Sequence, residues 1–430
     1  MRSGTPAASS TRRPSVDKTG RPSRGARPPS CWEERMVDIS QPAPVRSTFS
    51  VYDKKVRGIA YQTALAVSLM VIVAGVTTQT VSNMKQRGIP LTFDFWKQTA
   101  GFQISQTLIP YDTLSTYGQA FWVGVANTLL VSAFGIVLAT IIGFLIGISR
   151  LSNNWIAAKV ATSYVEVVRN IPLLLQLLFW YNAVLKPLPA PKASISIPGG
   201  IYLNNRGIIM PAVEFQAGAG WVGAAIFAAV AGAVAFGAYA RTVQKRTGRQ
   251  LPVLRVAIVV LIGLPLLASL AAGRPWTFSY PELKGFNFRG GQQIYPEFAA
   301  LLIGLSVYTA SFIAEIVRGG IQAVSKGQTE AAHALGLSHG KTLRLVIVPQ
   351  ALRIIIPPLT SQYLNLIKNS SLAVFIGYPD LVQVFAGSVL NQTGAAVQVM
   401  AITLAAYLVI SLITSAAMNT FNQYFALVER

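Results

Sequence analysis

The chain contains eight long apolar stretches, and these constrain its fold more than any other feature. A helix that crosses a bilayer needs roughly 20 mainly apolar residues, and polar or proline-rich residues separate stretches of about that length here. The stretches are 59–81, 119–148, 161–185, 221–240, 257–272, 298–317, 354–376 and 397–421. With 52% hydrophobic and 12% charged residues, the chain is too apolar for a soluble protein of 430 residues. We therefore expect an all-α, polytopic membrane protein with about eight transmembrane helices.

The distribution of Lys and Arg predicts the orientation of these helices, because short loops rich in basic residues stay in the cytoplasm. Of the 36 basic residues, 24 lie in four segments, namely 1–58, 149–160, 241–255 and 318–353. Only nine lie in the alternate segments 82–118, 186–219 and 273–296. Eight spans with both termini in the cytoplasm fit this distribution. The same flanks explain the net charge of +21, so we expect a bilayer and no nucleic acid as a partner.

Composition divides the chain into five segments. Residues 1–55 form a basic tail, rich in Arg, Pro and Ser near its start, that we expect to be disordered. Residues 56–118 hold the first span and an outer, periplasmic loop, and residues 119–185 hold the first part of a core. Residues 186–295 read as an insertion with two additional spans, and residues 296–430 hold the second part of the core. The single cysteine, Cys31, excludes an internal disulfide framework.

Polar side chains within the spans are candidates for lining a substrate path. They are Asn127, Glu166, Arg169, Tyr308, Ser311, Glu315, Lys368 and Ser371. Glu166 and Arg169 are three residues apart, as are Glu315 and Arg318, so each pair shares a helix face. Lys368 must face protein or water, because lipid exposure would cost several kcal/mol. These groups suit a polar or zwitterionic substrate, although several are equally consistent with structural ion pairs or interfacial anchors.

The polar loop 324–353 has the signals of two short helices. Ser325 and Gln328 have capping-box spacing, and Gly336 suits the left-handed residue that ends a helix. Ser338 can begin a second helix, which we expect Pro349 to end. On the first helix, small or apolar residues recur on one face near the single acid Glu330, namely Gly327, Ala331, Ala334 and Leu335. Such a face predicts a docked partner, and the alternative is a helical hairpin that packs on its own spans.

Two segments of the sequence resemble nucleotide-binding motifs, but neither meets the requirements of its motif. Residues 336–342 resemble a phosphate-binding loop but have three residues between the glycines where four are needed, and they follow a predicted helix. Residues 218–223 spell a dinucleotide fingerprint, but they open an apolar span and we expect no strand before them. His333 and His339 lie on different elements and do not form a metal site by themselves. We therefore expect no catalytic residue, metal or cofactor in this chain, and any ATP must be bound elsewhere.

The sequence from Glu330-Ala-Ala through Gly336 to Ile347-Val-Pro349 resembles the EAA loop of ABC importer permeases. Around it, Glu315-Ile-Val-Arg-Gly-Gly and Pro349-Gln-Ala-Leu-Arg are similar to the polar amino-acid family. The resemblance covers residues 115–185 and 296–430. The insertion and the ending Ala426-Leu-Val-Glu-Arg are similar to the Q-type permease of the general L-amino-acid transporters. That family has five or six core spans, so eight spans depart from its smaller members.

This resemblance implies a type I importer permease in the bacterial inner membrane, which takes up L-amino acids. Its implied partners are two ATPase subunits that hold ATP and Mg, a second permease that is related rather than identical, and a periplasmic amino-acid-binding protein. The residues that would match the coupling helix are Glu330, Ala331, Ala332, Gly336 and Leu337. A proton-coupled secondary transporter using Glu315 or Lys368 is the alternative. A membrane enzyme is disfavoured because the sequence shows no cluster of nucleophile, base and metal ligands.

Overall fold

A computed structural model describes residues 54–86, 88, 92–273 and 275–425, so nearly all of the predicted tail lies outside the described residues. Seven helices in this part of the chain are long and apolar enough to cross a membrane. They are α1 (Lys54–Gln86), α2 (Tyr117–Ser149), α5 (Ala219–Thr247), α6 (Val253–Ala271), α7 (Pro296–Gln322), a continuous helix over His339–Ile376, and α12 (Ala396–Phe425). An eighth candidate is the bent pair Trp155–Asn170 and Leu173–Leu185. The structure confirms a mainly helical membrane protein with seven or eight spans.

The third predicted span, 161–185, is broken rather than continuous. Helix α3 (Trp155–Asn170) ends before Pro172, and α4 (Leu173–Leu178) continues into the π-helical segment η2 (Phe179–Leu185). The piece formed by α4 and η2 is bent by 104° from α3. A residue before proline is pushed out of the helical region, and Ile171 has an extended conformation with φ −97° and ψ 126°. The predicted span is therefore a bent pair of helices in the structure and not one continuous helix.

Helix α1 is described by itself, because the described residues up to Thr77 belong to a different unit from the residues that follow. Apolar side chains on α1, such as Leu65, Met70 and Val76, are exposed over more than half of their surface.

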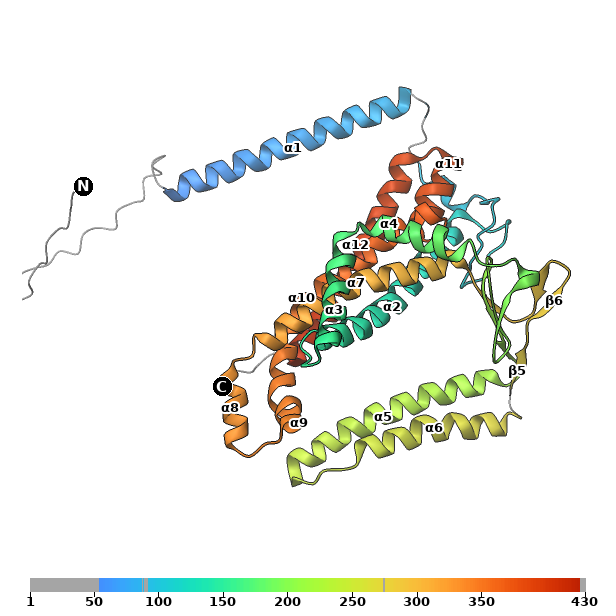
Figure 1. The fold of residues 1–430 in the computed structure, drawn as a ribbon. Helices are drawn as coiled ribbons and strands as arrows, with labels where there is room; N and C mark the ends of the chain where they lie inside the picture. The colour runs from blue at the N-terminus through green and yellow to red at the C-terminus, as the bar shows by residue number, and fades with distance from the viewer. Residues whose placement is uncertain (1–53, 87, 89–91, 274, 426–430) are drawn as a thin grey trace, which may run out of the picture. The chain divides into compact units, whose positions relative to one another are not determined.

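In the second unit, α2, α7 and α10 (Val348–Asn369) form the centre of the helical core (Figure 1). The core-facing side of α7 is fully buried at Leu305, Ile313 and Val317. Helices α2 and α7 approach closely at Gly147, where a Cβ atom would lie 2.7 Å from the carbonyl oxygen of Ala314. Small residues permit such approach between membrane helices, so this contact depends on glycine.

Helix α10 lies within a longer irregular helix. It is preceded by α8 (Lys326–Ala334), α9 (His339–Thr342) and the π-helical η4 (Leu343–Ile347), and it continues into the 3₁₀ segment η5 (Ser370–Ile376). After a turn at residues 377–381 come the π-helical η6 (Val382–Val389), the short α11 (Leu390–Thr393) and α12. Pro349 therefore does not end a helix, and that prediction is wrong. The N–H of Val348 bonds to the carbonyl of Leu343, which makes a π turn directly before Pro349. Proline has no backbone N–H, and the wider turn lets the helix continue without the hydrogen bond that Pro349 cannot donate.

Eight short strands lie in the inserted region and were not expected from the sequence. They are β1 (Ile195–Ile197), β2 (Ile201–Asn204), β3 (Gly207–Met210), β4 (Ala212–Phe215), β5 (Trp276–Ser279), β6 (Glu282–Lys284), β7 (Asn287–Arg289) and β8 (Gln292–Ile294). Strands β1, β2, β3 and β8 form a four-stranded antiparallel sheet, and β4–β5 and β6–β7 form two-stranded ladders. The short 3₁₀ turns η1 (Asp94–Lys97) and η3 (Pro191–Ala193) complete the described elements.

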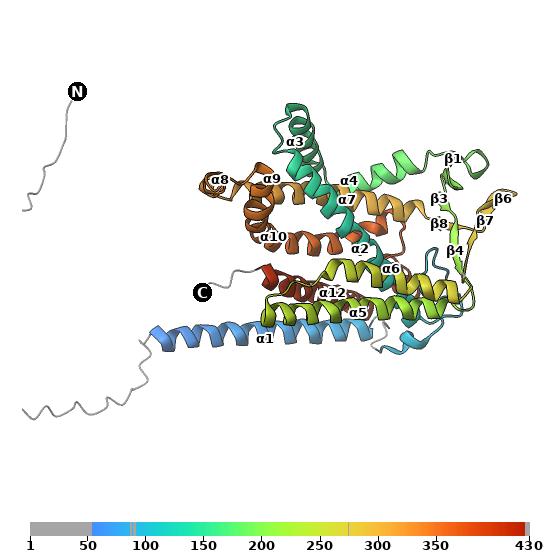
Figure 2. The ribbon, with the colours of Figure 1, turned by 90° about the horizontal axis from the view of Figure 1, so that it is seen from below.

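The strand pairings are nested around the two additional spans. Ile208 pairs with Ile294, and Phe215 pairs with Trp276. The segment before α5 and the segment after α6 therefore run antiparallel to each other and form a stem that leads to these two helices. Helices α5 and α6 lie side by side beyond that stem (Figures 1 and 2).

The strands and the α8–α9 segment lie at opposite ends of α7 (Figure 2). Strand β8 leads directly into the start of α7, and α8 follows its end. The core therefore has one end covered by short strands and another end that carries the loop with the EAA-like sequence.

Candidate functional site

Helix α8 ends at Ala334, and Gly336, two residues later, has the left-handed conformation predicted for the residue that stops this helix. Gly336 has a φ of +75°, its N–H bonds to His333 O at 2.9 Å, and the Leu337 N–H bonds to Ala332 O at 3.1 Å. These bonds satisfy carbonyls that a helix end leaves without partners. Ser325 is the N-cap residue, but its side chain makes no capping hydrogen bond, so only the position of the predicted capping box is correct.

Small and apolar residues form part of the exposed surface of α8. Gly327, Ala331, Ala334 and Leu335 are all exposed, and 82% of Leu335 is accessible. Glu330 is also exposed, whereas Ala332 is buried against this chain. A large exposed leucine beside small residues indicates a surface that another protein can cover.

The predicted coupling residues therefore divide into two sets. Glu330, Ala331 and Gly336 are exposed, while Ala332 is buried and Leu337 is half-buried. A hydrogen bond of 3.2 Å from Gln350 Nε2 to Gln328 Oε1 connects α8 to α10. The exposed residues can contact a partner, whereas Ala332 and Leu337 pack against the rest of this chain and hold α8 in place.

Three charged residues meet where α2 ends beside α7. Glu315 accepts hydrogen bonds from both Arg150 and Arg318, and each contact is also an ion pair. Arg150 has 11% side-chain exposure, while Glu315 and Arg318 are about one-third exposed. The Glu315–Arg318 pair predicted from spacing is confirmed, and Arg150 adds a link between α2 and α7.

Glu166 and Arg169 differ from that arrangement. Among the described residues they do not form an ion pair, and both are exposed. The guanidinium of Arg169 instead lies 4.8 Å from the centre of the Phe312 ring, a cation–π contact between α3 and α7.

Asn127 is fully buried and connects separate parts of the core. Its Nδ2 donates to the carbonyls of Gln106 and Pro379, each at 2.8 Å. The neighbouring Thr128 Oγ1 accepts from the Leu381 N–H at 3.0 Å. These bonds fix the 377–381 turn against α2, which is a structural use of both side chains.

Tyr308 and Ser311 also have partners within their own helix region. The Ser311 hydroxyl donates to Tyr308 O at 2.6 Å and is buried, and the Tyr308 ring lies 5.0 Å from the Phe312 ring. Neither side chain lies in the same cavity as Lys368.

Lys368 and Ser371 come together in a groove between the end of α10, η6 and α12. The groove has a volume of about 420 Å³. Its walls are formed by Lys368, Ser371, Val382, Ala386, Met400, Thr403, Leu404, Tyr407, Leu408 and Ser411. One cation, several hydroxyl groups and mostly apolar walls are the usual composition of a small-molecule site. We call this the Lys368 groove.

Comparison with known proteins places the chain in a family. Residues 233–425 match the family described as "Binding-protein-dependent transport system inner membrane component". The chain is 49% identical to the Escherichia coli (strain K12) protein YhdX, covering 90% of this chain and 98% of YhdX. It is 50% identical to the general L-amino acid transport system permease protein AapQ of Rhizobium johnstonii, covering 89% of this chain and 95% of AapQ. The chain belongs to the amino-acid ABC transporter permeases.

A permease of this family is a transport subunit and not an enzyme, and it lies in the inner membrane. The alignment with YhdX spans 388 residues, so it must include most of the inserted region 186–295. A third relative, the glutamate/glutamine/aspartate/asparagine transport system permease protein BztB of Rhodobacter capsulatus, is 40% identical over 90% of this chain and 97% of BztB. The sequence of the inserted region is thus matched for the most part in these relatives.

Two features of this permease were missed or misjudged from sequence. Asp380 is fully buried, accepts the Tyr407 hydroxyl at 3.1 Å, and lies directly behind the Lys368 groove. Its only sequence signal is a lone acid inside an apolar region. Gly218 does follow a strand, β4, so that premise of the sequence interpretation is wrong. The strand is antiparallel and α5 is an apolar span, which still differs from a dinucleotide-binding unit.

Proposed function

We propose that this permease imports L-amino acids as one of two related membrane subunits. ATP and Mg are held by two separate ATPase subunits, and a periplasmic binding protein delivers the substrate. The names of AapQ and BztB, which refer to L-amino acids and to acidic amino acids and their amides, support this substrate class. The family match favours this function over a proton-coupled secondary transporter.

The observation that carries this proposal is the exposed face of α8. Leu335 and Ala331 present apolar surface, Glu330 supplies the only carboxylate on that helix, and Gly336 ends it sharply. A short, capped helix can be moved as a rigid body by a partner that closes on it. Such a surface is what a chain without its own ATP site needs for coupling.

The connections of α8 explain how a push would reach the membrane. Helix α7 leads into α8 through a turn of three residues, and four residues separate the end of α8 from the helix that contains α10. Gly320 on α7 lies against Ile355 on α10, and α7 packs against α2 through Gly147. Inverting an access equilibrium from about 1:99 to 99:1 requires roughly 5.5 kcal/mol, which only a tightly engaged energy source supplies.

The Lys368 groove is the proposed substrate contact of this subunit. The Lys368 ammonium group suits the α-carboxylate of an amino acid, because the surrounding apolar walls strengthen a charge–charge contact. Ser371 and Tyr407 add hydroxyl groups on the same walls. Glu315 serves in this proposal as the link between Arg150 and Arg318, rather than as a ligand.

The proposed orientation places α8 in the cytoplasm and the strands outside. The bent pair α3–α4–η2 begins near the Arg150 end of α2 and leads to the strands, so it completes one crossing. With that crossing the chain has eight spans and both termini on the cytoplasmic side. The basic segments 241–255 and 318–353 then lie inside, in agreement with the positive-inside rule.

The test compares Glu330→Lys and Leu335→Asp with the wild-type chain. Each form of the chain is purified together with the subunits that co-purify with the wild-type chain. We expect both variants to lose ATPase association in a pull-down assay and ATP-driven amino-acid uptake in proteoliposomes. Lys341→Gln is the matched control, since it removes an exposed charge on α9 and leaves the α8 face intact. Normal association and uptake in both α8 variants would refute the coupling role.

A further inference from the structure

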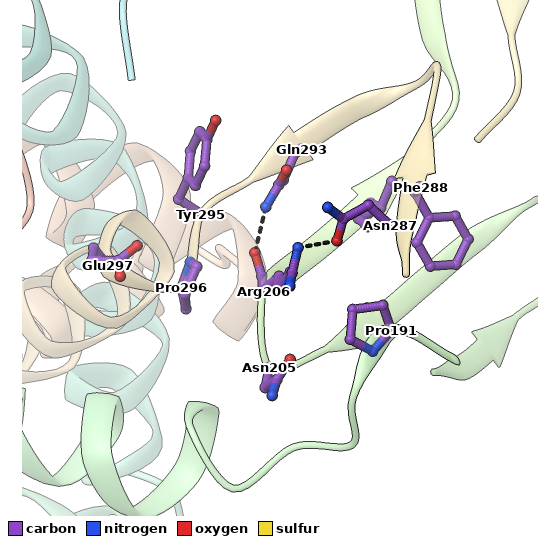
Figure 3. Close-up of a pocket in the computed structure, with 10 residues that line it drawn as sticks. Pro191, Asn205, Arg206, Asn287, Phe288, Gln293, Tyr295, Pro296 and Glu297 are labelled. Carbon is purple, nitrogen blue, oxygen red and sulfur yellow. Dashed lines mark hydrogen bonds between the residues drawn. The ribbon is translucent and has the colours of Figure 1, made fainter. Parts of the chain in front are cut away.

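A second pocket lies where the inserted strands meet the first turn of α7 (Figure 3). It is at the other end of the core from α8 (Figure 2). It has a volume of about 440 Å³. The residues that line it are Pro191, Asn205, Arg206, Ile209, Asn287, Phe288, Gln293, Tyr295, Pro296 and Glu297. Three of these carry carboxamide groups, one is a cation and one is a carboxylate. We call it the Arg206 pocket.

Arg206 is held in position by the sheet. Its N–H bonds to Asn204 Oδ1 at 2.9 Å, and its carbonyl accepts from Gln293 Nε2 at 2.6 Å. Asn204 is fully buried and donates to Ser194 at 2.9 Å. The guanidinium itself donates to Asn287 Oδ1 (Figure 3). One contact thus orients the guanidinium, and its remaining N–H groups stay available to a ligand.

Glu297 is held on the other side of the pocket. Its Oε1 accepts the Tyr181 hydroxyl from η2 at 2.7 Å, which orients the carboxylate at the start of α7. Figure 3 shows Glu297 on the helix side and Arg206 on the strand side. Among the described residues neither forms an ion pair, so their charged atoms lie more than 4.0 Å apart. Two opposite charges in one pocket that do not neutralise each other leave room for a ligand carrying both.

We propose that the Arg206 pocket binds a free α-amino acid as a zwitterion. Arg206 takes the α-carboxylate through the geometry that guanidinium groups favour, and Glu297 takes the α-ammonium group. The carboxamides of Asn205, Asn287 and Gln293 can bond to a polar side chain of the ligand. This inference rests on the proposed function and adds a binding site in the inserted region, separate from the Lys368 groove.

The pocket also joins three parts of the chain that are far apart in sequence. Arg206 lies in the β2–β3 turn, Asn287 in β7, and Glu297 in α7. A ligand that contacts all three would hold the inserted strands against the first turn of α7. Its binding should therefore slow backbone hydrogen exchange in these segments.

The test measures binding of L-glutamine and of its deamino analogue by calorimetry. The sample is the purified complex without binding protein and without ATP, carrying Lys368→Gln so that the groove does not contribute. We expect Arg206→Gln to weaken both ligands at least tenfold. Glu297→Gln should weaken only glutamine, by a similar factor, because the analogue has no ammonium group. Arg289→Gln, an exposed cation on β7 outside the pocket, should change neither affinity.

Two further measurements keep the result decisive if Arg206→Gln folds poorly. Arg206→Lys should retain part of the affinity, and glutamine should protect residues 204–210 and 287–297 from hydrogen exchange. No saturable binding, or affinity unaffected by all the Arg206 and Glu297 variants, would overturn the inference while ATP-driven uptake stayed intact. Loss of the importer function with binding retained would instead refute the proposed function alone.

Discussion

The hydroxyl group of Tyr407 donates a hydrogen bond to Oδ2 of Asp380 across 3.1 Å, immediately behind the Lys368 groove. Oδ1 of the same carboxylate accepts the Gln383 N–H at 2.8 Å. Asp380 is fully buried, so each of these bonds replaces one that water would otherwise supply. The pair therefore connects α12 to the turn that Asn127 fixes against α2.

Tyr407→Phe should lower the thermal unfolding midpoint of the purified permease. Removing one partner of a buried carboxylate costs about 1–3 kcal/mol, because the oxygen is left without a replacement. Scanning fluorimetry in detergent measures the midpoint. Tyr239→Phe is the control, since Tyr239 on α5 is exposed and its hydroxyl is not a partner of a buried carboxylate among the described residues. Equal midpoints for Tyr407→Phe and the wild-type chain would contradict a structural Asp380–Tyr407 pair.

Lys368→Gln should raise the KM of ATP-driven amino-acid uptake about tenfold or more. Loss of a charge contact between ammonium and carboxylate in a mainly apolar groove corresponds to at least ~1.4 kcal/mol of binding free energy. Lys368→Arg keeps the charge and should have a smaller effect. Initial uptake rates in proteoliposomes over a range of substrate concentrations separate KM from kcat. A change confined to kcat would place Lys368 outside the substrate contact.

The apolar pattern of the sequence located the spans well, because each must match the thickness of the bilayer. The apolar pattern did not predict where helices break or continue, because proline and the turns around it decide this and the length of an apolar stretch does not. Pro172 forces Ile171 out of the helix and breaks the third span, although the surrounding residues are apolar enough to continue it. Pro349 has the opposite outcome, since a π turn before it lets the helix continue. The direction of such an effect depends on neighbouring turns that composition does not encode.

Long-range pairings account for most of what the sequence could not predict. The Glu315–Arg318 pair follows from helix spacing, but Arg150 lies 165 residues before Glu315. Strands β3 and β8 pair across the two additional spans and have only four and three residues. Pairings of this kind depend on the packing of whole helices. The proposed coupling residues, by contrast, lie within one short segment, so their prediction rests on local signals and not on long-range pairing.

Gly320→Ala should destabilise the contact between α7 and α10. A Cβ atom at Gly320 would overlap Cγ1 of Ile355, and overpacking of this kind costs about 1–3 kcal/mol. The adjacent Gly319 is a matched control on the same helix, because a Cβ atom there meets nothing within 4 Å. Gly319→Ala should be neutral or stabilising by up to about 1 kcal/mol, since alanine favours helix. Similar unfolding midpoints for the two variants would refute the close α7–α10 approach.

Glu315→Gln should destabilise the permease more than Arg318→Gln does. Glu315 is the shared partner of two arginines, so its neutralisation leaves the Arg150 charge, with 11% side-chain exposure, without its ion-pair partner. Arg318→Gln removes a more exposed charge and leaves the Arg150–Glu315 pair in place. We expect the free energy of unfolding to fall by about 1–3 kcal/mol in Glu315→Gln and by less than about 1 kcal/mol in Arg318→Gln. Both losses are smaller than for a fully buried ion pair, because solvent screens this site.

The double variant Arg150→Gln with Glu315→Gln separates this explanation from a general loss of packing. If the cost arises from an unpaired Arg150 charge, removing that charge as well should recover part of the stability lost in Glu315→Gln. Unfolding midpoints of the two single variants and the double variant form the required cycle. Strictly additive losses would show that Arg150 and Glu315 do not interact, and that α2 and α7 are held together by the Gly147 contact and the apolar core alone.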